Sequence, residues 1–456
     1  MNRQLFLVSG LISCLACDVV CAQVAPLDYS SARDLVRDRS DVLRINSSET
    51  ARREHETESL RSLHGPKVTA EFRHLWGSKD VDLGQKQINL GPGLPIPPIS
   101  VPLRFSQDLY GPRVIGSIEL PIYMGGAISA KIAASEASVT EAREDEQAAR
   151  DRLDITLAQK YFGVQLARSV LQLRQSMLDQ QNEELRRANR MKQTGSVSRL
   201  ESMAVAVDRD KSAQELIASE TDVKIAENDL MRLLHEETLG KLTTPLFVLS
   251  GSVGNLQDWK TKAALGSPAL RSIRAKRLQA EQGVKVAKAA WAPQVYAFAQ
   301  GNAIKHYLSV TEPDWVAGIG VKFTLWDNKD RNESIASARA LVDKASAGIQ
   351  EAQNQIEQAV ETAYLRTRQT QDQYLLTLST LELARENLRL RQRAFEEGLC
   401  TAVELSEART QLLGAEITRR VSAYQFVVSW ATLNAVCGTA DDFVASFNRK
   451  DNFIEK

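Results

Sequence analysis

The chain has little of what marks a nucleic-acid-binding protein or an ordinary globular domain. Aromatic residues make up 6% of its 456 residues, and prolines number 13. Its 57 basic residues are balanced by 57 acidic ones. No positive excess is present to neutralise phosphates, so nucleic acid is not an expected partner. The 25% of charged residues, together with many Ala, Gln, Glu, Arg and Leu, is typical of long helices.

Long hydrophobic runs are also missing, except at the N-terminus. Residues 1–22 have a charged start, an apolar centre and small residues at the end, which predicts a signal peptide cut between Ala22 and Gln23. An alternative is a lipoprotein cut before Cys14, because residues 11–14 (LISC) resemble a lipobox. No later run approaches 18 apolar residues. We therefore expect an exported chain that either stays soluble or crosses a membrane as a β-barrel.

Motifs for catalysis, cofactors or metals are not apparent. Outside the signal peptide only Cys400 and Cys437 remain of the five cysteines, and they suggest neither a disulfide framework nor a metal site. The five histidines show no ligand spacing, and His235 lacks the second histidine of a zinc-protease helix. We expect no enzyme activity and no cofactor.

What the chain does have is an internal repeat. The two copies match without a gap at a shift of 203 residues (398 − 195), from about 118 and 321 to 230 and 433. Aligned pairs include Gly195 with Gly398, Tyr161 with Tyr364, and Glu201 with Glu404. Upstream the shift is 227 (293 − 66), so the first copy carries 24 extra residues (227 − 203). They fall within 77–112, where the sequence GPGLPIPP predicts an irregular loop.

Each repeat is predicted to hold a helix, two short strands and a hairpin of two very long helices. Strands are expected near 66–76, 113–123, 293–304 and 315–326, and the hairpins turn at Gly195 and Gly398. The predicted segments are a signal peptide (1–22), repeat one (23–235), a linker (236–258), repeat two (259–437) and a C-terminal tail (438–456). Linker and tail are expected to form a belt around the helices.

The helical and strand patterns point to a coiled, membrane-inserted structure. Val342, Ala345 and Ile349 begin a 3,4-spaced seam typical of coiled coils. Residues 127–193 contain no proline, which allows a rod of about 100 Å at 1.5 Å per residue. The strands alternate apolar and polar residues, as in a membrane barrel or a half-buried soluble sheet. The export signal and the rods favour the barrel, which needs several chains, because four strands cannot close one. Three chains would give twelve.

This plan resembles the TolC family of outer-membrane channel proteins. The resemblance rests on the duplication, on Pro66 and Pro293 at the starts of strands, and on the two glycine turns, and it covers about 23–438. It implies a mainly α fold with a β part: a homotrimer with a twelve-stranded outer-membrane β-barrel that continues into a periplasmic α-helical barrel. The implied partners are outer-membrane lipid, a periplasmic adaptor (membrane fusion) protein and an inner-membrane pump of the RND, ABC or MFS type.

The resemblance also implies roles for the two turns. The hairpin tips would dock the adaptor through Gly195, Ser196, Val197, Gly398, Leu399 and Cys400. A periplasmic gate would be lined by Glu404, Glu407 and Glu201, although each could simply be a solvated helix residue. The family places an arginine two positions after the second glycine, where this chain has Cys400.

The implied function is passive efflux of drugs or toxic small molecules through a tripartite export system. One alternative is the outer-membrane component of type I protein secretion. A second, from a different class, is a soluble periplasmic coiled-coil scaffold with small β inserts.

Overall fold

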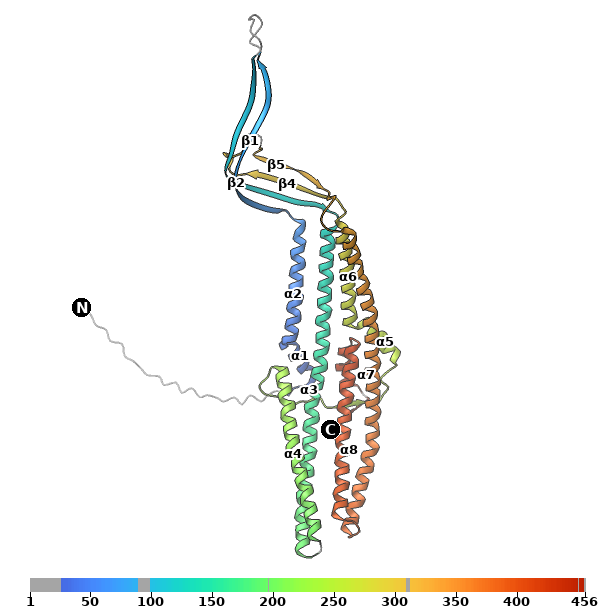
Figure 1. Ribbon diagram of the computed structural model, residues 1–456. Helices are drawn as coiled ribbons and strands as arrows, with labels where there is room; N and C mark the ends of the chain where they lie inside the picture. The colour runs from blue at the N-terminus through green and yellow to red at the C-terminus, as the bar shows by residue number, and fades with distance from the viewer. Residues whose placement is uncertain (1–25, 89–98, 196, 309–311, 450, 455–456) are drawn as a thin grey trace, which may run out of the picture.

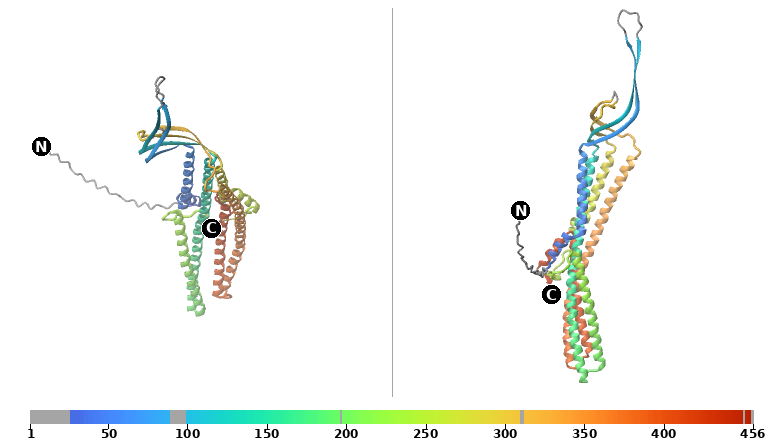
Figure 2. Two further views of the ribbon diagram at one scale, coloured as in Figure 1. Left: turned by 45° about the horizontal axis from the view of Figure 1, so that its top comes forward. Right: turned by 90° about the vertical axis from the view of Figure 1, so that its left-hand side faces the viewer.

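The computed structural model describes residues 26–88, 99–195, 197–308, 312–449 and 451–454 (Figure 1). The predicted cut at Ala22 and Gln23, the alternative lipidation at Cys14, and Ser196 lie outside these residues. The described part is a rod of helices with a β-sheet at one end and two helical hairpins at the other (Figures 1 and 2).

Two long hairpins form the body of the rod. The first consists of α3 (Ala127–Gln193) and α4 (Arg199–Leu234), and the second of α7 (Arg331–Glu396) and α8 (Ala402–Val436). With 67 and 66 residues, α3 and α7 are each about 100 Å long at 1.5 Å per residue. The expectation of very long helices is therefore confirmed. No helix among the described residues combines the length and apolar character that crossing a bilayer requires.

Shorter helices complete the half of the rod next to the sheet. The helix α2 (Asp41–Arg61) packs on α3, and α6 (Pro268–Ala289) packs on both α3 and α7. Side-chain caps fix where α2 and α7 begin, since Ser40 accepts from the amide of Leu43 and Asp330 accepts from those of Asn332 and Glu333. These helices hold the sheet at a fixed place above the hairpins.

The sheet is antiparallel, in the order β1-β2-β4-β5. Its strands are β1 (Lys67–Ile88), β2 (Ile99–Met124), β4 (Gln294–Asn302) and β5 (Trp315–Lys322). Because β4 pairs only with residues 115–124 of β2, β1 and β2 continue beyond the four-stranded part as a two-stranded ribbon (Figure 2). The expected irregular loop over 77–112 is thus wrong for most of its length. Its proline-rich residues 91–98 lie outside the described part.

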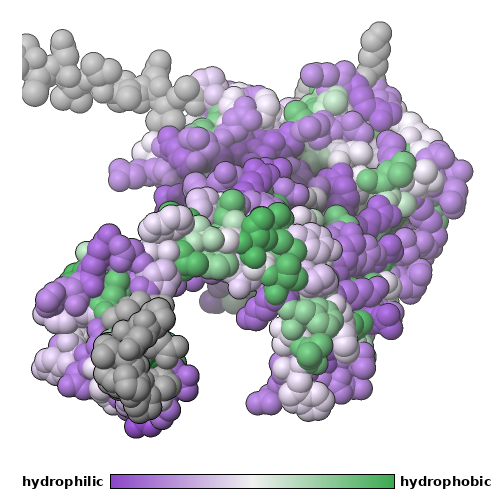
Figure 3. Space-filling model, turned by 90° about the horizontal axis from the view of Figure 1, so that it is seen from above, coloured by the Kyte–Doolittle hydropathy of each residue, from purple (hydrophilic) through white to green (hydrophobic). Residues whose placement is uncertain are grey.

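The two faces of the four-stranded part differ in character. One carries exposed apolar side chains, among them Val68, Phe72, Ile118, Ile319 and Val321. The other carries polar residues and two rings that lie over glycines, because Tyr296 pairs with Gly320 and Phe298 with Gly318. A Cβ at Gly320 would lie 2.6 Å from Tyr296 Cζ, so only glycine leaves room for that ring. Seen from above, hydrophobic residues form patches within a largely hydrophilic surface (Figure 3).

The main hydrophobic core lies halfway along the rod, where the first and last segments of the described chain meet. Here α1 (Tyr29–Arg39), α5 (Leu256–Gly266) and α9 (Ala440–Ala445) pack against the long helices. The rings of Tyr29, Tyr161, Phe162, Phe247, Phe426 and Phe443 are buried together. In the same region β3 (Phe247–Leu249) pairs with β6 (Asn452–Ile454). The linker and the tail therefore lie side by side, while a closed belt around the helices stays a prediction.

Candidate functional site at the helical hairpin tips

Both hairpins turn at a glycine with a left-handed backbone. The φ angle is +77° at Gly195 and +75° at Gly398. The Gly195 amide donates to the Lys192 carbonyl over 3.2 Å, and the Gly398 amide donates to the Phe395 carbonyl over 3.1 Å. Apart from the adjoining residues of the chain, no atom among the described residues lies within 4 Å of a Cβ placed at either glycine. The backbone angle, rather than crowding, is therefore what favours glycine at both turns.

The helix after each turn begins with the same capping box. In the first, the Ser198 amide donates to Glu201 Oε2 over 3.0 Å and the Glu201 amide donates to Ser198 Oγ over 3.1 Å. In the second, Thr401 and Glu404 make the matching bonds of 2.9 and 3.3 Å. An acidic residue six positions after the glycine thus has a local structural cause: it caps the new helix. The proposed gate function of Glu201 and Glu404 comes in addition to this role.

Arg391 on α7 supplies a cation to the second tip. Its Nη1 lies 3.2 Å from Glu404 Oε1 and 3.9 Å from the Cys400 sulfur. Hydrogen bonds from the Thr401 backbone and from the side chains of Cys400 and Thr401, with the charge of Arg391, lower the pKa of Glu404 to about 2. Partial burial, the largest cause, raises the pKa of the Cys400 thiol. The second tip therefore has an arginine next to Glu404, but it is Arg391 of α7 and not a residue at position 400, which holds a cysteine.

Exposed apolar side chains surround these turns. Leu399 lies in the second turn, and Val403 follows in the first turn of α8. Leu200 and Met203 are exposed at the start of α4, and Leu200 matches Val403 at the repeat spacing of 203 residues (403 − 200). Val197 is half-buried and Glu407 is exposed. Sequence reasoning missed Leu200, Met203 and Val403, although their position just after the glycine turns could have marked them.

Buried polar contacts join the two hairpins just above their tips. Arg409 Nη1 of α8 lies 2.9 Å from Glu184 Oε2 of α3, with only 12% and 6% of these side chains exposed. Beside this pair, Gln181 donates to Ser406 Oγ over 3.3 Å, and Ser406 donates to Asp208 over 2.8 Å. Closer to the tips, an apolar cluster contains Ala188, Val205 and Ala402, flanked by Leu185 and Phe395. The hairpins are therefore held in a fixed arrangement, and nothing in the sequence pattern identified these contacts.

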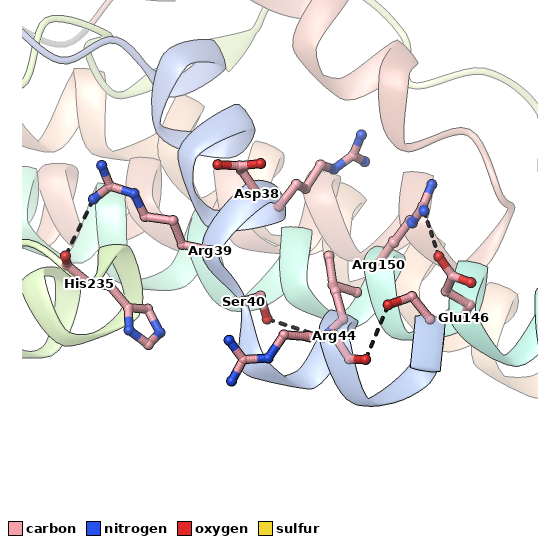
Figure 4. A pocket seen from close by; sticks show the side chains of 10 residues that line it. Asp38, Arg39, Ser40, Arg44, Glu146, Arg150 and His235 are labelled. Carbon is pink, nitrogen blue, oxygen red and sulfur yellow. Dashed lines mark hydrogen bonds and ion pairs between the residues drawn. The ribbon is translucent and has the colours of Figure 1, made fainter. Parts of the chain in front are cut away.

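A polar pocket lies at the end of α1 (Figure 4). Every arginine that lines it is paired with a carboxylate of this chain: Arg37 with Asp154, Arg39 with Glu236, Arg44 with Asp41, and Arg150 with Glu146. Arg39 ties the bend between α1 and α2 to the end of α4, because its Nη1 also donates to the His235 carbonyl over 3.3 Å (Figure 4). Within the described residues, no three His, Cys, Asp or Glu side chains are grouped to hold a metal ion.

Comparisons with known proteins give one consistent result. A family model described as "Outer membrane efflux protein" matches residues 51–235 and 259–439. No curated protein matches the chain. Among solved structures, CusC, described with its transmembrane channel formation, shares 15% identity over 90% of this chain and 92% of its own, with a TM-score of 0.73.

Two further structures are similar in the same way. The Campylobacter jejuni CmeC outer membrane channel shares 14% identity over 92% of this chain and 89% of its own, with a TM-score of 0.71. The Vibrio cholerae outer membrane protein VceC shares 13% identity over 90% of this chain and 96% of its own, with a TM-score of 0.70. At these identities the likeness establishes the fold.

Proposed function

Since the chain belongs to the outer membrane efflux protein family, we propose that three copies of it assemble into one channel that carries small molecules out of the cell. The protein is an outer-membrane efflux channel component whose helices extend into the periplasm. The proposal adds the number of copies, the cargo class and the partners. A periplasmic adaptor would bind the hairpin tips, and an inner-membrane pump would supply the cargo.

The observation that carries the proposal is the pair of open edges on the sheet. Within the described chain β1 and β5 are the outer strands of the order β1-β2-β4-β5. The face with Phe72, Ile319 and Val321 is exposed and apolar, as a lipid-facing surface must be. In hydrocarbon, unpaired backbone groups cost several kcal/mol each, so edges have to pair. Pairing β5 of one copy with β1 of the next closes a barrel at three copies, which have twelve strands (3 × 4).

The opposite face of the sheet fits the lining of a water-filled passage. Thr69, Glu71 and Arg73 alternate along β1 on that face, and Ser117 of β2 lies directly opposite Thr69. These polar side chains are hydrogen-bonded in pairs. Arg73 donates to Glu71, and the Thr69 and Ser117 hydroxyls lie 2.6 Å apart. A polar inner face and an apolar outer face together favour a channel over the soluble scaffold.

The proposed gate and docking site lie at the other end of the rod. We place the adaptor on the tips at Gly195, Ser196, Val197, Gly398, Leu399 and Cys400, and extend this surface to Leu200 and Val403, whose exposed apolar side chains a partner could cover. In a trimer, Glu404 and Glu407 would form acidic rings near the tips, with Glu201 close by. The Arg391–Glu404 pair would take the place of a pair made from position 400.

Assembly and conduction can be tested together on protein extracted from outer membranes with detergent. The expected result is a particle with three times the mass of one mature chain, which electron microscopy resolves as a hollow rod, and stepwise conductance in planar bilayers. A water-soluble monomer that gives no conductance would overturn the proposal.

A further inference from the structure

The two-stranded ribbon keeps one register over most of its length. Pairs run without a break from Lys67 with Glu119 to Asp82 with Arg104. Side chains alternate between the two faces of a strand, so an unbroken register keeps even-numbered residues on one face and odd-numbered residues on the other. The lipid-facing and pore-facing sides of the sheet can therefore be followed into the ribbon residue by residue.

The polarity of the two faces is exchanged at Trp76 and Tyr110. These exposed residues are direct partners, and the His74 ring contacts both. Aromatic residues of this kind gather where a barrel meets the membrane surface. Before them, the even face is apolar. Beyond them, the even face is polar: Ser78, Asp80, Asp82, Arg104, Ser106 and Asp108.

The odd face changes in the opposite sense. Between Lys67 and Trp76, the odd face carries Thr69, Glu71 and Arg73. Beyond the aromatic pair it carries Leu109, the polar pair Lys79 and Gln107, and then a group that we call the ribbon patch: Val81 and Phe105, with Leu83 and Leu103 next to them where the register shifts. Val81 and Phe105 are direct partners. The exposed fraction is 56% for Phe105 and 63% for Leu83, and the other two are half-buried.

Among the described residues, those that follow β4 cover the odd face only up to the ribbon patch. The Tyr307 ring lies over Gly111, where a Cβ would come within 2.3 Å of it. Arg113 pairs with Glu312 over 2.5 Å. Further along, Gln107 Nε2 donates to the Leu308 carbonyl over 3.1 Å, opposite Lys79. Tyr307, Leu308 and Glu312 thus cover the lower ribbon, while Phe105 and Leu83 are exposed above them.

We propose that the ribbon patch binds the same patch on the other copies of the chain, on the pore axis beyond the outer membrane surface. This rests on the proposed trimer. The odd face continues the pore-lining face, so it points towards the axis around which the other copies lie. Another copy of the chain is favoured over lipid as the occupant, because the patch continues the pore-lining face rather than the apolar face that points to the bilayer. Association removes apolar surface from water and gives the free strand edges a neighbour.

Matched single cysteines test this interface in the intact channel. We replace the exposed native thiol (Cys400→Ser) and add either Phe105→Cys on the patch or Ser106→Cys on the opposite face, then treat each with a short bis-maleimide. The expected result is several-fold more cross-linked chains for Phe105→Cys. Equal or weaker cross-linking than for Ser106→Cys, in particles that have the mass of a trimer and conduct, would overturn the inference and leave the proposed channel standing. Particles without that mass would count against the channel itself.

A second pair of variants tests whether apolar contact holds the ribbons together. A cysteine at Leu103→Cys is combined with Phe105→Asp on the patch or with Ser106→Asp on the polar face. We expect cross-linking through position 103 to fall several-fold with Phe105→Asp and to persist with Ser106→Asp. Equal cross-linking in the two double variants would contradict an apolar interface.

Discussion

The Arg391 guanidinium of α7 and the Glu404 carboxylate of α8 face each other across the turn at Gly398, with Nη1 and Oε1 3.2 Å apart. The same carboxylate accepts the Thr401 amide, so one side chain both caps a helix and carries a charge at the tip. These two roles can be separated by substitution, because glutamine keeps an acceptor for the cap and loses the charge.

We first predict opposite effects of the two members of this pair on ion selectivity. Glu404→Gln should lower the cation preference of the channel, since it removes one negative charge per copy near the tips, and Glu404→Gln with Glu407→Gln should lower it further. Arg391→Gln should raise the preference. The cation preference is measured from reversal potentials in planar bilayers under a salt gradient. Identical values for all three variants would show that the tips do not form the constriction.

A second prediction concerns the two faces of β5. Val321 lies on the exposed apolar face, and Lys322 follows on the other face. Val321→Asp should reduce assembly into the outer membrane, because a charge on the lipid face is unfavourable, by up to about 2–4 kcal/mol for Lys or Arg at the midplane and by less for Asp or near the membrane surface. Lys322→Asp should assemble normally. Trimer yield in outer-membrane fractions measures both, and equal yields would argue against a lipid-facing side at Val321.

The third prediction is that the buried Arg409–Glu184 pair stabilises the packing of the hairpins. Arg409→Leu leaves the Glu184 carboxylate without this partner in a site where 6% of it is exposed. Loss of one member of such a pair costs about 3–5 kcal/mol, so thermal unfolding should begin at a clearly lower temperature. Arg389→Leu, which breaks the exposed pair with Glu386, should change the midpoint little. A similar, small shift for both variants would contradict the prediction.

The fourth prediction is a pH-dependent effect at Asp151. Burial raises the pKa of this carboxyl to about 6, and its buried Oδ2 has no hydrogen-bond partner among the described residues. A folded-state pKa above the unfolded one means that this group adds stability as the pH falls from about 6 towards 4. Asp151→Asn should therefore raise the unfolding midpoint at pH 8, by the equivalent of about 1–3 kcal/mol, and the gain should shrink by pH 4.

Asp154 provides the control for that measurement. It is also buried on α3, but it pairs with Arg33 at 2.9 Å and Arg37 at 2.6 Å. Asp154→Asn should destabilise at pH 8, because it leaves Arg37 without its carboxylate and leaves Arg33 paired with Asp441 alone. A loss of stability in both variants at that pH would refute the account given for Asp151.

Much of the architecture could be predicted because its signals are local or repeated. The family resemblance and the very long helices are confirmed, and both depend on spacing along the chain: the repeat at 203 residues and the run from 127 to 193 without proline. The docking and gate residues stay proposals. For Glu201 and Glu404 the sequence motif also has a simpler cause, since each completes a capping box.

The ribbon and the Arg391 contact show where sequence reasoning failed. Glycines and prolines between 77 and 112 suggested a loop, yet residues 77–88 and 99–112 stay extended because β1 and β2 pair with each other there. Arg391 precedes Glu404 by 13 residues, and only the geometry of the turn brings the two together. Both features depend on contacts between residues whose sequence spacing carries no signal.

By itself, the sequence determined the length of the helices, the positions of their glycine turns and the alternation of the strands, because periodicity and backbone freedom act within a few residues. Tertiary structure alone decided the pairing of the ribbon, the exchange of its faces at Trp76 and Tyr110, and the buried Arg409–Glu184 contact. These depend on register and on which helices lie side by side, and a linear pattern does not specify either.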